Sequence, residues 1–125
     1  MNPYKDEDQT ELSEDGKLYK LAVDSWGMDP QINMVTEELG ELIVAIQKWK
    51  RKPGESTVRD IASEVADVEI MLGQLHYMMD NYIERKYSVN LDEERKYKRN
   101  RLKIRLKVND DDLDRIANSL FDKVR

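Results

Sequence analysis

The stretch EELGEL (Glu37–Leu42) places acidic residues inside an otherwise apolar helical pattern, and so does EVADVEIML (Glu64–Leu72). Each stretch contains two carboxylates three residues apart. Positions three apart lie on one face of an α-helix, so the members of each pair project together. Acids in such surroundings cost stability unless something neutralises them. The pairs are Glu38 with Glu41, and Glu64 with Asp67.

The sequence around the first pair predicts a long helix. Apolar residues recur at helical spacing over Pro30–Arg51, and the Pro53-Gly54 pair is expected to end the helix. Asp29 is the expected N-cap, because a proline suits the position after it. The short turn that follows places the next helix antiparallel and adjacent, so all four carboxylates are expected to converge.

The sequence around the second pair predicts another long helix, capped by Ser56 or Thr57 and reaching about Met79. Between Val65 and Met79 this helix is apolar around most of its circumference. A helix of this kind needs cover on several sides, so we expect a homodimer or a homotetramer.

The remaining segments extend the helical pattern. A first helix is predicted over residues 17–26, and a short amphipathic helix over residues 110–124. Between them, Asn90 followed by Glu93 is typical of a cap that begins a helix, which we expect to reach at least Leu102. The expected fold is therefore all-α, a four-helix bundle with an additional short C-terminal helix.

The composition excludes several classes of protein. The 125 residues include no cysteine, so disulfides and thiolate metal sites are excluded. The chain has 26 acidic and 21 basic residues, a mixture that argues against a protein that coats DNA. No apolar stretch suits a signal peptide or a membrane span, and a cytoplasmic location is expected.

The negative charge of converging carboxylates can be neutralised in two ways, by lysine and arginine side chains or by divalent cations. Mg²⁺ takes oxygen ligands, and in enzymes these ligands usually include phosphate oxygens of the substrate. A plain alternative is a solvated face, because acidic pairs three apart are common in a chain this rich in acids. A di-iron bundle is disfavoured because it needs Glu-x-x-His motifs, and the single histidine, His76, belongs to none.

These acids and their flanks resemble the MazG-type all-α nucleoside triphosphate pyrophosphohydrolases, a superfamily that includes dimeric dUTPases and dCTP pyrophosphatases. The family signature is ExxE, a spacer, then ExxD, and the flanks WGMDPQ, ELIVAIQKWKR and IASEVADVEIMLGQL match as well. The likeness is greatest to the small single-domain proteins of phages and bacteria. It covers residues 16–106, the expected domain. A flexible acidic arm over residues 1–15 and a helical extension over residues 107–125 have no counterpart.

The resemblance implies hydrolysis of a (d)NTP to the (d)NMP and pyrophosphate, with Mg²⁺ as cofactor and Mn²⁺ as a substitute. It also implies that Glu38, Glu41, Glu64 and Asp67 are the metal ligands. An acid that is not fully engaged by metal would orient or deprotonate the attacking water, and Glu37 and then Glu41 are our candidates. For Glu37 the alternative is an ordinary surface glutamate.

Binding of the rest of the nucleotide is assigned to two further groups of residues. By the family match, Lys96, Arg99 and Asn100 are expected to reach the triphosphate, while the alternative is a solvated basic face. Trp26 is expected to stack on the base and Gln31 to hydrogen-bond its edge; alternatively, Trp26 closes the core.

A different functional class remains open beside the enzyme. In this alternative the chain is a non-catalytic helical interaction or regulatory module that binds a partner or nucleic acid through the basic segment 95–107. It predicts no metal dependence and binding that weakens steeply with salt. The enzyme hypothesis instead expects a (d)NTP substrate and no contact with nucleic acid or membrane.

Overall fold

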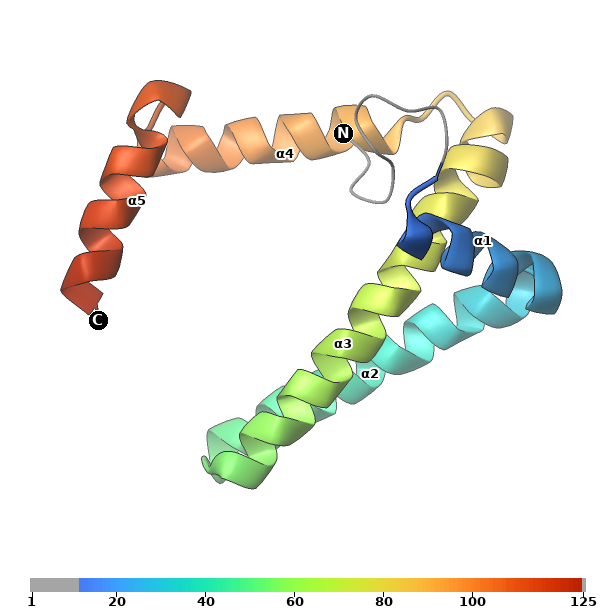
Figure 1. Ribbon diagram of the computed structural model, residues 1–125, viewed down its shortest axis with the longest axis horizontal. Coiled ribbons are helices and arrows are strands. Elements are labelled where there is room, and N and C mark those ends of the chain that lie inside the picture. The colour runs from blue at the N-terminus through green and yellow to red at the C-terminus, as the bar shows by residue number, and fades with distance from the viewer. Residues whose placement is uncertain (1–11, 125) are drawn as a thin grey trace. The chain divides into compact units, whose positions relative to one another are not determined.

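The computed structural model describes residues 12–124, and the fold of this part is all-α, as predicted (Figure 1). The described chain forms two compact units, one that ends at Val89 and one that begins at Asn90. The expected domain of residues 16–106 spans both units. The arm expected over residues 1–15 lies mostly outside the described residues.

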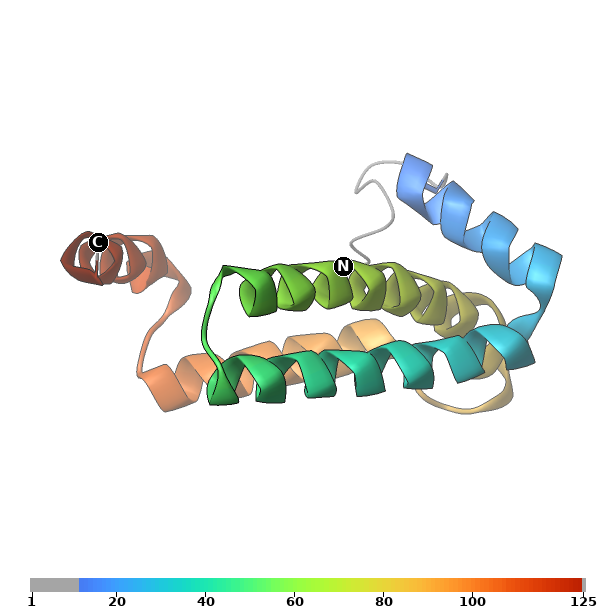
Figure 2. The same cartoon turned by 90° about the horizontal axis from the view of Figure 1, so that it is seen from below.

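Helices α2 (Met28–Arg51) and α3 (Glu55–Met78) form an antiparallel hairpin and lie side by side in both views (Figures 1 and 2). Their buried and half-buried positions recur in alternating steps of three and four residues, as in the seam between packed helices. On α2 the seam consists of Gln31, Val35, Glu38, Leu42 and Ala45, and on α3 of Ile61, Glu64, Val68, Met71 and Leu75.

The start of each hairpin helix differs from the prediction. Gly27 caps α2 with φ 92°, a left-handed conformation that favours glycine, and Asp29 lies in the first helical turn. Asp29 as the cap was therefore wrong. Gly54 caps α3 in place of Ser56 or Thr57, and the hydroxyl of Thr57 donates to the Gly54 carbonyl at 3.0 Å. In both cases a glycine occupies the cap position where a residue with a capping side chain was expected.

Helix α1 (Glu14–Trp26) packs against α3 near the end of the hairpin. Its buried residues include Tyr19 and Val23, and Val23 shares a small core with Tyr77 and the fully buried Met78. The ring of Tyr19 lies directly over a glycine of α3, Gly73. This close approach depends on the missing side chain, since a β-carbon there would overlap the ring.

Replacing Gly73 by alanine is expected to lower the free energy of unfolding by about 1–3 kcal/mol, the usual effect of overpacking a tight contact. The ring of Tyr19 is only 7% exposed, and it would have to shift to make room for the added β-carbon. Urea denaturation measures the effect. Gly40→Ala is the control, because its β-carbon would meet nothing within 4 Å and alanine favours the helix. A Gly73→Ala variant as stable as the wild type would contradict this packing.

Two irregular turns that the sequence did not predict follow α3: a π-helical turn, Met79–Ile83, and a 3-10 turn, Glu84–Lys86. A π-turn closes its hydrogen bonds over five residues instead of four. Here it brings the rings of Tyr77 and Tyr82 together edge to face, with centroids 5.8 Å apart.

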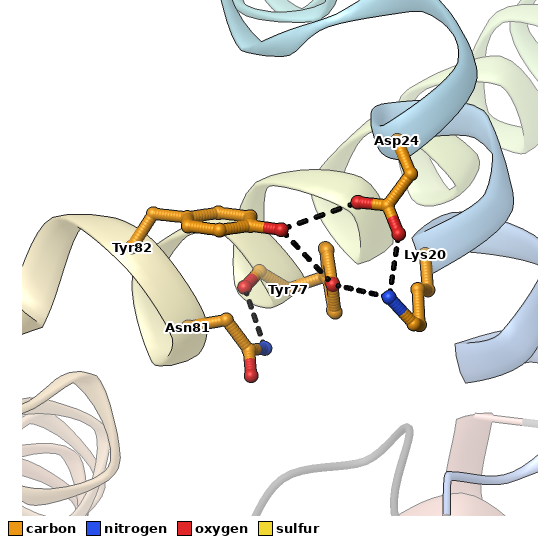
Figure 3. A network of polar contacts seen from close by, with 5 residues as sticks. All are labelled: Lys20, Asp24, Tyr77, Asn81 and Tyr82. Atoms are coloured by element: carbon orange, nitrogen blue, oxygen red, sulfur yellow. Dashed lines mark hydrogen bonds and ion pairs between the residues drawn. The ribbon is translucent and has the colours of Figure 1, made fainter.

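A hydrogen-bonded network of four polar side chains connects α1 to this end of α3 (Figure 3). The ammonium group of Lys20 donates to Asp24 at 2.5 Å and to the Tyr77 hydroxyl at 3.2 Å. The Tyr82 hydroxyl donates to the other oxygen of Asp24 at 3.2 Å and lies 3.4 Å from the Tyr77 hydroxyl. The π-turn thus has a structural partner in α1.

The second unit contains α4 (Leu91–Leu106) and α5 (Asp110–Val124). The predicted cap is confirmed, because the side chain of Asn90 accepts from the backbone N–H of Glu93 at 3.0 Å. Helix α4 continues past Leu102 to Leu106, although apolar and basic residues alternate over RLKIRL (residues 101–106). None of the side chains of α4 is buried.

Large apolar side chains remain exposed on α1 and α3, in line with the expectation that α3 needs cover on several sides. The most exposed are Leu18, Leu21, Trp26, Val58, Val65, Ile70 and Leu72. Within residues 12–124, no helix combines the length and the apolar character that crossing a bilayer requires.

Candidate metal centre

Three of the four expected ligands come together between α2 and α3. Glu38, Glu41 and Glu64 each offer a carboxylate oxygen, and these oxygens lie within 4.8 Å of one another. We call these three residues the acid cluster. Glu38 and Glu64 are half-buried because they occupy seam positions, whereas Glu41 lies one turn along α2 at the exposed edge of the seam.

Asp67, the fourth expected ligand, lies one turn along α3 from Glu64 and is exposed. Among the described residues, the group within 4.8 Å does not include it. Its charge nevertheless acts on the cluster, since it is one of the causes that raise the pKa of Glu38. Asp67 therefore borders the cluster from the α3 side.

The acid cluster is electrostatically unfavourable as it stands. Burial, followed by the charges of Glu41 and Asp67, raises the pKa of Glu38 to about 7. Burial and then the charge of Glu41 also raise the pKa of Glu64. The Oε2 atoms of Glu38 and Glu64 are shielded from water and have no hydrogen-bond partner.

No positively charged side chain neutralises this charge among the described residues: none of the ion pairs found there involves a member of the acid cluster. Buried polar atoms in native proteins normally have partners. The donors present are carboxylate oxygens, which are the ligands that hard divalent cations such as Mg²⁺ prefer. The residues therefore fit the metal that the sequence predicted.

An open groove of about 540 Å³ adjoins the acid cluster between α2 and α3, within the usual size range of small-molecule sites. Glu37, one of the two candidate bases, is exposed and lines this groove. The polar side chains of the lining are those of Glu37, Glu41, Lys48, Asp60, Ser63 and Glu64. A ligand in the groove would meet mainly acids and one cation.

Lys48, Asp60 and Ser63 were not predicted as site residues. The only signal in the sequence is spacing: Lys48 follows Glu41 by seven residues, and Asp60 precedes Glu64 by four, so each shares a helix face with a predicted ligand. That signal is weak, because every long helix contains many such neighbours.

The two residues assigned to the base lie near the other end of the hairpin. Trp26 is 66% exposed and lines an apolar hollow of about 380 Å³ together with Leu21, Ile70 and Gln74. Gln31 is 5% exposed, and its Nε2 donates to Oε1 of Gln74 at 2.6 Å. A direct contact between Gln31 and a base would require this pair to open. Contact of Trp26 with a base stays a prediction.

The three residues assigned to the triphosphate, Lys96, Arg99 and Asn100, lie on α4 in the second unit and are exposed. Lys96 and Asn100 are four residues apart and share a face of the helix. Within this unit, Lys103 and then Arg99 lower the pKa of Asp110. The triphosphate contacts stay a prediction.

Comparisons of the chain with known protein families, curated proteins and solved structures find no match. The resemblance to MazG-type enzymes therefore stays a prediction from the two acid pairs and their flanking residues.

Proposed function

We propose that this chain is a Mg²⁺-dependent nucleoside triphosphate pyrophosphohydrolase of MazG-like fold, which converts a (d)NTP to the (d)NMP and pyrophosphate. The observation that carries the proposal is the acid cluster, in which Glu38 and Glu64 have shielded carboxylate oxygens without partners. Of the two ways to neutralise such a cluster, basic side chains have no support among the described ion pairs. A divalent cation is the other way, and below about pH 7 a proton on Glu38 removes part of the charge instead.

The proposed mechanism divides the acids between two tasks. Glu38, Glu41, Glu64 and Asp67 would hold Mg²⁺, which supplies the positive charge that a triphosphate needs at an acidic site and polarises its phosphoryl oxygens. Glu37 lines the groove one turn before Glu41 and would take the proton of a water molecule as that water attacks phosphorus. Pyrophosphate leaves as the new phosphorus–oxygen bond forms.

Positive side chains would complete the substrate site. Lys48, in the groove, is our addition to the predicted phosphate contacts Lys96, Arg99 and Asn100. An ammonium group there would offset the negative charge of phosphate oxygens that metal does not hold. Trp26 would stack on the base.

A panel assay tests the proposal. The purified chain is incubated with each canonical (d)NTP and with modified nucleotides, with Mg²⁺ or with a chelator, and pyrophosphate release is recorded. We expect release with at least one nucleotide, and none with the chelator. No release with any nucleotide, or release that a chelator leaves unchanged, would contradict the proposal.

One observation favours the alternative, an interaction module that uses the basic segment 95–107. The Tyr97 ring is exposed, with Lys98 and Arg101 each 5.9 Å from its centre. Basic groups around an exposed aromatic ring suit single-stranded nucleic acid. Fluorescence anisotropy with a labelled oligonucleotide at increasing salt separates the two functions, because only the module predicts tight, salt-sensitive and metal-independent binding.

We further propose that a second copy of the chain covers the exposed apolar side chains of α1 and α3. Leu18, Leu21, Trp26 and Ile70 line one apolar hollow, and exposed apolar surface of this kind marks interaction sites. Light scattering is expected to give two or four times the chain mass of 14.8 kDa. A chain that stays monomeric at micromolar concentration would contradict it.

A further inference from the structure

A buried amide pair joins α2 and α3 on the side of the acid cluster away from the hairpin turn. The side chains of Gln31 and Gln74 are 5% and 4% exposed, and they meet in a hydrogen bond of 2.6 Å. The amide nitrogen of Gln74 also lies 3.8 Å from the sulfur of Met71, a weak acceptor. A hydrogen bond between two buried amides is directional, unlike the apolar contacts around it.

The hydrogen bond places Gln31 and Gln74 at the same height along the two helices. Seven residues further along α2 is Glu38, and seven residues earlier along α3 is Asp67. Three more residues in each direction lead to Glu41 and Glu64. At 1.5 Å per residue, the two acid levels lie about 10 and 15 Å from the amide pair. The register that joins the amides is therefore the register that brings the acids opposite one another.

The apolar residues of the seam select this register less strongly. Val35, Leu42, Val68 and Met71 are buried or half-buried, and the burial of apolar side chains is non-directional. A slip of one turn, about 5.4 Å, would leave only one acid of α2 level with one acid of α3, and it would break up the group whose oxygens now lie within 4.8 Å. Repulsion among the acids favours that slip when no cation is bound.

The acids lie between two restraints. The connection over residues 52–54 holds one end of the hairpin, and the amide pair holds the other. Glu38 is seven residues from Gln31 but fourteen from residue 52, so the amide pair is the nearer restraint for Glu38, whereas Glu41 and Glu64 lie about midway between the two restraints. A single buried polar position is known to fix the register of paired helices at some cost in stability.

We propose that Gln31 and Gln74 are positioning residues, which fix the register of α2 and α3 and thereby hold the carboxylates at ligand distance. The role in metal binding rests on the proposed function, whereas the role in register does not. Neither glutamine touches metal or substrate in this role.

Metal binding by the double variant Gln31→Leu/Gln74→Leu tests the proposal. Leucines preserve the packing of the seam, so the melting temperature should equal or exceed that of the wild type. The Kd for Mg²⁺, measured by calorimetry, is expected to rise at least tenfold. Each single variant should melt lower than the double variant, because one buried amide is left unpaired. The matched control is Gln47→Leu, an exposed glutamine of α2, which should leave the Kd unchanged.

A second measurement reads the register without metal. The chain has no cysteine, so Thr36→Cys and Ser56→Cys on the exposed surfaces of α2 and α3 allow specific spin labelling. In the wild-type background, diluted with unlabelled chain, we expect one distance. The leucine double variant should show an additional population of molecules, in which the distance between the two labels differs by about 5 Å, the rise of one helical turn.

The outcomes separate the two proposals. An unchanged spin-label distance, or an unchanged Kd for Mg²⁺ in the leucine double variant, would overturn the positioning role. A wild-type chain that does not bind Mg²⁺ would instead contradict the proposed function, and the spin-label distances would still decide the register.

Discussion

Replacing Glu38 by glutamine is expected to lower kcat/KM for pyrophosphate release by about a thousandfold. A bound metal ion stabilises the transition state by several kcal/mol, and about 1.4 kcal/mol corresponds to a tenfold change in rate. The same change should raise the melting temperature of the metal-free protein at pH 8 by a few degrees. With a pKa of about 7, Glu38 is ionised at that pH in a site that disfavours its charge. Glutamine keeps the shape and removes the repulsion.

Steady-state kinetics and thermal melts in the presence of a chelator measure the two effects on one preparation. Glu69→Gln is the matched control, because Glu69 is exposed on α3 and lies outside the groove lining. It should change neither quantity. A Glu38→Gln variant that melts well below the wild type would assign Glu38 a structural hydrogen bond instead. Full activity of that variant would remove the acid cluster from the proposed site.

The long helices of the hairpin could be predicted because their determinants are local. Periodic apolar residues predicted α2 and α3 within a few residues, and the Pro53-Gly54 pair predicted the turn between them. The π-turn could not be predicted, since Tyr82 is bound to Asp24, a residue 58 positions away in the sequence. The capping role of Gly27 was missed because Asp29 gave a stronger local signal.

The sequence predicted the acids of the site but not their separate roles. Both pairs have the same spacing, so each predicts two carboxylates on one helix face. Which acid is half-buried depends on where α2 faces α3, and this placed Glu38 and Glu64 in the seam, with Glu41 and Asp67 at its edge. The partner of Gln31 was hidden for the same reason, because it lies on the opposite helix.

Mg²⁺ is expected to raise the melting temperature more at pH 8 than at pH 5.5. Burial and neighbouring charges raise the pKa of Glu38 from 4.5 to about 7 in the folded chain. Between these values the folded protein keeps a proton that the unfolded chain has released, so the stability of the metal-free protein falls as the pH rises through this window. Near pH 8 the carboxylate is ionised and repelled by its neighbours, which is the condition that favours a bound cation. Protons and Mg²⁺ therefore compete for the same oxygens.

Melting curves recorded from pH 5.5 to pH 8, with saturating Mg²⁺ or with a chelator, measure the competition. The gain from Mg²⁺ should grow through the pH range around 7, and it should be smaller and flatter in Glu38→Gln, which has lost the titrating group. A gain of equal size at every pH would mean that the ion binds to acids of ordinary pKa. Such acids are abundant on the exposed faces of the helices, and the ion would then not be held by the seam carboxylates, whose burial separates them from the rest.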